Sequence, residues 1–201
     1  MTTSPDLDVQ THTGRCFGDG DPLYSKYHDD EWGKAVHGDA ELFERIVLEG
    51  FQSGLSWLTI LRKRDAFRQA FGGFDPAVVA AFGDVDIERL MADARIVRNR
   101  RKIEAAVTNA RAIVALQESG RSLESVVWAH APAPRTQRFA TLAEVPGSTP
   151  QSMALAKELK SLGFVFVGPT TMYALMQACG LVDDHVAACP TAEAGSDGQS
   201  G

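Results

Sequence analysis

The sequence predicts an all-α fold, and three observations support this class. Apolar residues recur at helical spacing along most of the chain. Helix boundaries are marked by Asp-Pro or Thr-Pro pairs at their starts and by glycines at their ends. No segment alternates apolar and polar residues with the two-residue period of a half-buried strand. The clearest amphipathic face belongs to a helix expected from about residue 100 to 118, with Ile103, Ala106, Val107, Ala110, Ile113 and Val114 on one side.

The other helices follow from the same signals, in chain order. Asp39 and Asp86 are expected as N-caps, and the pairs that start at Asp75 and Thr149 each place a proline at the first helical position. The short apolar run over 164–167 is too short to predict a strand. The expected helices are 23–32, one that begins after Asp39, 56–71, 76–82, 86–94, 100–118, 122–129, 150–162 and 170–179.

Length, charge and cysteine content bound the class of protein. A chain of 201 residues with 44% hydrophobic residues suits one helical domain, expected over 15–189 with two lobes as an option, between disordered tails over 1–14 and 190–201. The net charge of −6 argues against bulk electrostatic binding of nucleic acid but allows a local basic patch. Three cysteines do not form a disulfide framework, so we expect a cytoplasmic protein. No signal peptide or membrane segment is recognised, and a monomer is the default expectation.

Residues 42–64 place a carboxylate in an apolar setting. Glu49 follows an amphipathic helical face, and a carboxylate is rarely buried without a partner. Gly50 and Gly54 loosen the helix before Trp57, so an acid and an aromatic ring can form a small pocket. The alternative is a solvated Glu49 beside a core tryptophan, and this stretch alone favours that alternative.

Two cysteine–histidine pairs lie near opposite ends of the chain. His185 and Cys189 are four residues apart, a spacing that places both side chains on one face of a helical turn. Cys16 and His28 form the second pair, and two thiolates with two imidazoles favour one closed, structural zinc site. An isolated pair would more simply be a stray histidine and an inert buried cysteine. Together the pairs predict a zinc ion that joins the two ends.

A tight turn between two helices, over 90–110, is rich in positive charge. Backbone N–H groups at such a turn and at the following helix start can hold a phosphate. Several cations at a helix N-terminus oppose the helix dipole, so they need an anion or exposure to solvent. A solvated helix start is the plain alternative. The basic residues expected to bind DNA here are Arg95, Arg98, Arg100, Arg101 and Lys102.

Four stretches carry a family resemblance: 21–33 (DPLYSKYHDDEWG), 42–57 (especially LEG-x-Q-x-GLSW), 96–110 (IVRNRRKIEAAVTNA) and 164–185 (FVFVGPTTMYALMQACGLVDDH). Through them the chain closely resembles the bacterial 3-methyladenine DNA glycosylase I family, from about residue 15 to residue 189. The resemblance implies a helix-hairpin-helix DNA glycosylase-like fold with a zinc site that joins the N- and C-terminal segments.

Residue roles follow from this resemblance position by position. The family's zinc ligands fall on Cys16, His28, His185 and Cys189, and its phosphate-binding hairpin falls on about 93–102. The base-recognising and catalytic carboxylate falls on Glu49. The aromatic residues of the substrate pocket fall on Tyr27 and Trp57, with Trp32 close by, whereas Cys179 has no ligand role.

The implied activity is base-excision repair of alkylated double-stranded DNA. The damaged nucleotide would be flipped into the pocket, and its N-glycosidic bond hydrolysed to release 3-methyladenine. The resemblance implies a monofunctional enzyme without a lyase step. Zinc would be structural, because protein ligands fill all four positions.

Two departures from the family pattern keep alternatives open. Gly18 stands where the family often has tryptophan, so the upper wall of the pocket can differ, although Phe17 can fill the same space. Arg95 and Arg101 stand where the hairpin usually carries glycines, which tolerate a positive φ more cheaply. The alternatives are a broader alkylpurine glycosylase, a non-catalytic zinc-stapled helical DNA-binding module, and a helical protein–protein adaptor. Glu49 together with Tyr27 and Trp57 argues against a simple DNA-binding module.

Overall fold

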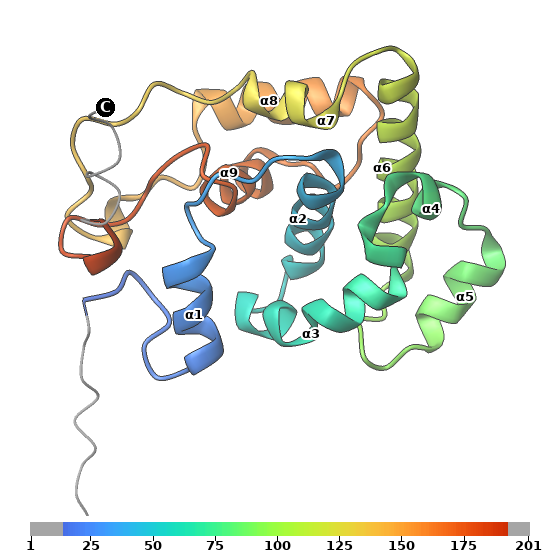
Figure 1. The fold of residues 1–201 in the computed structure, drawn as a ribbon, viewed down its shortest axis with the longest axis horizontal. Coiled ribbons are helices and arrows are strands. Elements are labelled where there is room, and N and C mark those ends of the chain that lie inside the picture. The colour runs from blue at the N-terminus through green and yellow to red at the C-terminus, as the bar shows by residue number, and fades with distance from the viewer. Residues whose placement is uncertain (1–13, 193–201) are drawn as a thin grey trace, which may run out of the picture.

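The all-α prediction is confirmed. The structure is a computed structural model that describes residues 14–192, and this range contains nine α-helices, three short 3₁₀ helices and no strand (Figure 1). The α-helices are α1 Pro22–Asp30, α2 Asp39–Gln52, α3 Trp57–Ala70, α4 Pro76–Ala80, α5 Asp84–Ala92, α6 Arg100–Glu118, α7 Leu123–Trp128, α8 Pro150–Ser161 and α9 Pro169–Ala178. The 3₁₀ helices are η1 Gly72–Phe74, η2 Leu142–Glu144 and η3 Pro190–Ala192.

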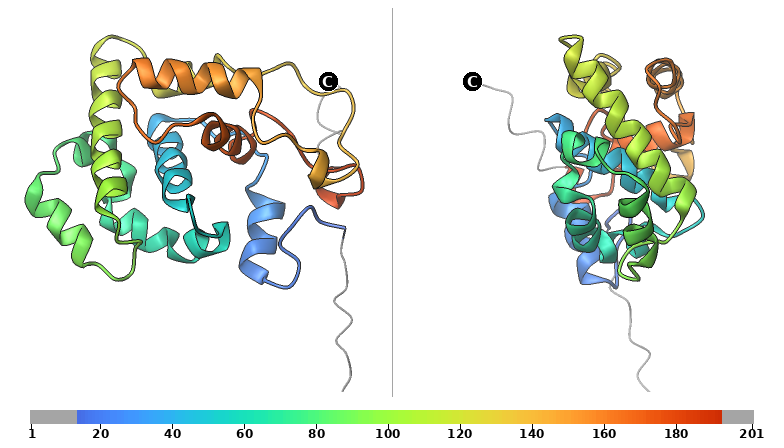
Figure 2. Two further views of the ribbon diagram at one scale, coloured as in Figure 1. Left: turned by 180° about the vertical axis from the view of Figure 1, so that it is seen from behind. Right: turned by 90° about the vertical axis from the view of Figure 1, so that its right-hand side faces the viewer.

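Helix α2 is the central element of the fold. It packs against α3, α6, α7 and α9, which surround it in Figures 1 and 2. Leu42, Phe43 and Leu48 of α2 are completely buried, and each such side chain contributes roughly 1.5–3 kcal/mol to folding. The helix that the apolar pattern predicts after Asp39 is therefore held from several sides, and this support fixes the position of its C-terminal turn.

Side-chain caps begin several helices where the sequence predicts them. The Asp75 carboxylate accepts a hydrogen bond from the N–H of Ala77 at the start of α4. Thr149 accepts one from the N–H of Ser152 in α8. Both caps precede a proline at the first helical position, which needs no hydrogen-bond acceptor there.

Two predicted caps are wrong, because the helices begin earlier than expected. Gly38 precedes α2, and Asp39 is its first residue. The Asp39 carboxylate instead accepts hydrogen bonds from the Glu124 N–H and the Gln117 side chain, so it joins α2 to α7 and α6. Helix α5 begins at Asp84 after Gly83, and Asp86 accepts the Gly83 N–H from inside the helix.

The first and last described segments lie side by side next to α1 (Figures 1 and 2). The N–H of Val186 donates to Sγ of Cys16 at 3.3 Å, across 170 residues of chain. The predicted N-terminal tail, 1–14, lies outside the described residues except for Gly14. The predicted C-terminal tail, 190–201, begins with η3 and otherwise lies outside them.

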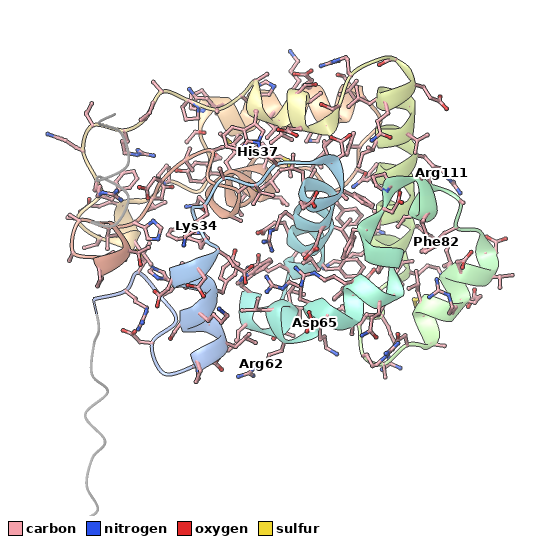
Figure 3. All side chains as sticks on the ribbon, viewed as in Figure 1. Lys34, His37, Arg62, Asp65, Phe82 and Arg111 are labelled. Atoms are coloured by element: carbon pink, nitrogen blue, oxygen red, sulfur yellow. The ribbon has the colours of Figure 1, made fainter. Side chains whose placement is uncertain are left out.

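Helix α6 lies on the other side of α2 from α1 (Figure 1). Figure 3 shows Arg111 of α6 directed toward Phe82, and its guanidinium donates to the carbonyls of Ala80 and Phe82, so the end of α4 is fixed on α6. The apolar run at 164–167 forms a loop. Both backbone polar groups of Val165 hydrogen-bond to the buried Asn109 side chain, which takes the place of a strand partner.

No helix among the described residues is both long enough and apolar enough to cross a membrane.

Candidate active site and metal centre

A cavity of about 240 Å³ lies where α1, α2, α3 and α9 meet. In Figure 1 the lower end of α2 leads toward α3, and α1 and α9 lie on one side of α2. The predicted carboxylate and the three predicted aromatic residues all reach this one cavity. Its lining consists of Phe17, Tyr24, Tyr27, Trp32, Glu49, Gln52, Trp57, Leu142, Ala174, Gln177 and Ala178.

Glu49 is the acidic group of the cavity. It is 7% exposed, and its carboxyl oxygens form no hydrogen bond with any residue in the described range. Burial raises its pKa to about 8, against a smaller opposing effect of the Arg45 charge one helical turn earlier. A buried carboxyl group without a hydrogen-bond partner is costly, which sets Glu49 apart from the other residues that line the cavity.

Two aromatic rings form a wall of the cavity beside Glu49. The ring centroids of Tyr27 and Trp57 lie 5.4 Å apart, and both side chains are largely buried. Nε1 of Trp57 is a buried donor without a hydrogen-bond acceptor. Trp32 lines the cavity further back, against the imidazole of His185 at 4.6 Å between ring centroids.

The upper wall of the cavity is Phe17 rather than a residue at position 18. Gly18 has φ +94°, and a Cβ there would lie 2.9 Å from backbone atoms of Tyr24. Glycine is therefore required by this backbone. The Phe17 ring centroid lies 4.9 Å from that of Tyr24 and 5.0 Å from that of Trp32. Phe17 therefore fills the space that a tryptophan at position 18 would occupy.

Cys16, His28 and Cys189 form a group that could hold a metal ion. One ligand atom from each lies within 4.8 Å of the others. Nε2 of His28 lies 3.5 Å from Sγ of Cys189. These residues come from the segment before α1, from α1 itself and from the last described segment, so three of the four predicted ligands lie together where the two ends meet.

His185 lies beside this group. Its ring centroid is 5.1 Å from that of His28, and its Nε2 is buried without a hydrogen-bond partner. The expected helical turn over 185–189 is not formed, because the segment is a loop with a turn closed by the Cys189 N–H on the Val186 carbonyl. The loop brings Cys189 into the group and leaves the His185 ring in contact with that of His28.

Each histidine is oriented by a carboxylate. Nδ1 of His28 donates to Asp29 at 2.9 Å, and Asp29 is held by Arg15, whose hydrogen bonds lower its pKa to about 2. Nδ1 of His185 donates to Asp183 at 2.8 Å. Burial opposes ionisation of Asp183, but hydrogen bonds from His185 and Arg138 outweigh it and lower its pKa. Both imidazoles therefore present Nε2 to the metal group.

The basic residues of the hairpin between α5 and α6 differ in their surroundings. Arg95 is paired with Asp93 at 2.8 Å, and Arg100 with Glu88 at 2.6 Å. Nζ of Lys102 donates to the carbonyls of Phe51 and Ser53, so it ties the end of α2 to α6. The side chains of Arg98 and Arg101 are exposed and form no ion pair or hydrogen bond with other described residues.

The hairpin does not require the glycines that the family usually carries. Arg95 and Arg101 both have negative φ, because the non-glycine residues with positive φ in the described range are Phe74 and Phe166. Arg101 already belongs to α6. The N–H groups of Val97, Arg98 and Arg101 donate to no acceptor among the described residues, which leaves them available to an anion.

Several residues around both sites were not identified from the sequence. Tyr24, Gln52, Leu142, Ala174 and Gln177 line the cavity, and Asp29 and Asp183 orient the histidines. The aspartates had a sequence signal, since each lies within two residues of a predicted metal-binding histidine. Leu142 had none, because its place at the cavity depends on the tertiary path of the residues between α7 and α8.

A family model described as methyladenine glycosylase matches residues 17–192. The chain is 49% identical over 170 residues to DNA-3-methyladenine glycosylase 1 of Escherichia coli (strain K12), covering 84% of this chain and 91% of that protein.

Solved structures show the same architecture. A crystal structure of 3-methyladenine DNA glycosylase I has a TM-score of 0.84 at 48% identity, covering 87% of this chain and 97% of that one. A variant of 3-methyladenine DNA glycosylase I in complex with 3-methyladenine has a TM-score of 0.82 at 35% identity, covering 88% and 95%. The shared fold, the cavity and the match over nearly all described residues lead to one conclusion: the chain belongs to the methyladenine glycosylase family.

Proposed function

We propose that this protein is a DNA-3-methyladenine glycosylase that acts in base-excision repair. The observation that carries the proposal is the partnerless, buried carboxyl of Glu49 beside the Tyr27 and Trp57 rings. Relatives at high identity are DNA-3-methyladenine glycosylases, and one similar structure binds 3-methyladenine. The cavity of about 240 Å³ is lined by Glu49 and aromatic rings, and a base must leave the duplex stack to reach such a pocket.

The cavity fits an electron-poor purine. A purine methylated at N3 is cationic in DNA, and its exocyclic amine donates hydrogen bonds. Tyr27 and Trp57 offer ring faces for a cation–π contact worth roughly 1–2 kcal/mol in a desolvated site. Glu49 then accepts a hydrogen bond from the base and offsets its charge. Burial deprives the Glu49 carboxylate of water, and the positive charge of the bound base stabilises the carboxylate in place of that water. Binding of the cationic base therefore favours ionisation of Glu49, and ionisation of Glu49 favours binding.

Hydrolysis needs less chemical assistance here than at an ordinary nucleotide. The leaving base departs neutral, so its glycosidic bond is already weak. Glu49 is placed to stabilise positive charge that develops on the sugar or to orient the attacking water. Within the described range, the residues that line the cavity include no lysine. This composition supports a monofunctional hydrolase without a Schiff-base step.

The proposed metal is one structural zinc ion held by Cys16, His28, His185 and Cys189. The first, second and fourth already form a compact group, and the orphaned Nε2 of His185 supplies the missing donor beside it. Two sulfur and two nitrogen donors match the preference of zinc for tetrahedral sites. Bound there, zinc would fix the ends of the chain, and its filled coordination leaves no position for a substrate.

The proposed duplex-binding element is the hairpin before α6. Its free N–H groups and the exposed Arg98 and Arg101 suit backbone phosphates. Lys102 contributes indirectly, because its bonds to Phe51 and Ser53 set the distance between the hairpin and the base cavity. This arrangement explains how an acidic protein can bind DNA through one local surface.

Base release tests the proposal directly. Purified protein is incubated with methylated duplex DNA, and released bases are separated by chromatography. We expect release of 3-methyladenine with little 7-methylguanine, since Phe17 occupies the upper wall of the cavity. Release of both would indicate a broader alkylpurine glycosylase. No release by folded protein would contradict the enzyme assignment and favour a non-catalytic DNA-binding module.

A further inference from the structure

Gln177 of α9 lies on the wall of the base cavity. Its backbone carbonyl accepts the N–H of Gly33 at 3.1 Å, which joins α9 to the segment after α1. The side chain is only partly buried, and the neighbouring sequence does not mark it as a substrate-binding residue. The carboxamide, however, has a fixed partner on one side.

That partner is Asp184, a carboxylate that is 1% exposed. Oδ2 of Asp184 accepts hydrogen bonds from Nε2 of Gln177 at 2.9 Å and from the Tyr173 hydroxyl at 2.5 Å. Oδ1 accepts from Arg135 at 2.9 Å. An ion-paired carboxylate can only accept hydrogen bonds. The atom of Gln177 that faces Asp184 must therefore be its NH₂ group, and rotation of the amide by 180° would set two oxygens against each other.

The remaining polar atom of Gln177 is Oε1. It forms no hydrogen bond with any residue between 14 and 192. Gln177 lines the proposed base cavity, so its unpartnered amide oxygen is an acceptor that can serve a bound base. Unlike the Glu49 carboxyl, it cannot change role by gaining a proton at neutral pH.

We propose that Gln177, locked by Asp184, is a specificity-determining residue that presents Oε1 to the C6 substituent of the bound purine. This inference rests on the proposed glycosylase function. An amino group at C6 donates to Oε1. A keto oxygen at C6 places two acceptors together, and the locked amide cannot turn to relieve the repulsion. Sites built around a hydrogen bond reject analogues that cannot form it. Gln177 thus selects 6-aminopurines over 6-oxopurines independently of the methyl group.

The test uses a pair of free bases that differ at C6, 3-methyladenine and 3-methylhypoxanthine. Dissociation constants for both are measured by calorimetry at one pH with wild-type protein and Gln177→Leu. We expect the wild type to prefer 3-methyladenine, and the variant to lose about tenfold of that preference, the size of one hydrogen bond. Gln177→Met, which keeps the side-chain length, provides the same measurement if the leucine variant does not fold.

Gln117→Leu is the matched control. Nε2 of Gln117 also donates to a carboxylate, that of Asp39, but on the exposed side of α6. It should leave the preference unchanged. A merely structural role for Gln177 would weaken binding of both bases equally, and an unchanged ratio overturns the inference. If the wild type binds neither base, the proposed function itself fails, which is a different result.

Discussion

The imidazole of His185 donates from Nδ1 to Oδ1 of Asp183 at 2.8 Å, two residues earlier in the chain. The same aspartate accepts from the N–H of His185, and Arg138 holds its other oxygen. The ring is therefore fixed in one tautomer and one orientation. Its Nε2 is buried without a partner beside Cys16, His28 and Cys189. We therefore expect His185 to be a ligand of the metal ion, through Nε2.

Protein purified without added metal is expected to contain one zinc ion per chain. His185→Ala should lower the zinc content and the melting temperature, on the order of 10 °C, because loss of a structural metal removes several kcal/mol. Elemental analysis and thermal melting measure both effects. His37→Ala is the matched control, since His37 is exposed and bonds to Glu124. A metal-free protein of full stability would exclude the zinc site.

Glu49→Gln is expected to reduce base release by about 100-fold or more, the scale of one positioned catalytic group. The variant should also be more stable than wild type at pH 8, by on the order of 1–3 kcal/mol. Single-turnover release from methylated DNA and thermal melting provide the measurements. Wild-type turnover by a folded Glu49→Gln protein would show that the carboxylate is structural.

The stability effect has a definite pH dependence. The folded pKa of Glu49 is about 8, above its ordinary value of 4.5. Between these values the folded chain keeps a proton that the unfolded chain has released, so the wild type loses stability as pH rises. The difference between wild type and Glu49→Gln should therefore be small near pH 4 and grow toward pH 8. An equal difference at both pH values would contradict burial of this carboxyl.

Arg45 is expected to set the pH dependence of activity. It lies one turn before Glu49 with one guanidinium nitrogen on Glu31 and another, Nη1, buried without a partner. In wild type, kcat/KM should rise with pH through a step near the Glu49 pKa of about 8. Arg45→Met should move the step upward by roughly one unit, because a nearby cation lowers a carboxyl pKa.

No titratable neighbour of Glu49 among the described residues is expected to add a second step to the pH profile of kcat/KM near neutral pH. Burial raises the pKa of Tyr24, of Tyr27 and of Cys179, so all three stay protonated across neutral pH. Arg68→Met is the matched control, since Arg68 pairs with Glu44 on another face of α2. If the step in kcat/KM occurs at the same pH in Arg45→Met and Arg68→Met, Arg45 does not set the pKa of Glu49.

Changing Arg98 and Arg101 together to alanine should weaken duplex binding and reduce the salt slope of the binding constant by about two. Both side chains are exposed and unpaired among the described residues. Arg100→Ala, which removes a cation already paired with Glu88, should have a smaller effect. Fluorescence anisotropy across a salt series measures the slopes. If wild type and all variants show the same salt slope, the duplex does not bind at the hairpin between α5 and α6.

Lys102→Met separates a structural from an electrostatic role. Nζ of Lys102 bonds to two carbonyls at the end of α2, so its loss should lower stability and base release while the salt slope stays near wild type. A slope change as large as that of the Arg98 and Arg101 variant would contradict this assignment.

Local chemistry in the sequence determined the helices and the identity of the reactive groups. Apolar spacing, prolines and glycines fix where helices form because these effects act within a few residues. The predicted starts at Asp39 and Asp86 were wrong because N-caps depend on backbone geometry one residue at a time, and Gly38 and Gly83 took those positions. The family resemblance, carried by motifs as specific as 21–33, indicated the activity and the zinc ligands.

Tertiary structure alone decided how those groups are used. The sequence could not show that Lys102 faces α2 rather than solvent, since that depends on the packing of α6 against α2. The sequence offered Phe17 as a substitute for the missing tryptophan, but it could not show that the backbone at Gly18 excludes any side chain there. Nor could it pair Gln177 with Asp184, which lie on opposite sides of the turn after α9. Burial, charge pairing and amide orientation are properties of distant segments brought together, and sequence spacing does not encode them.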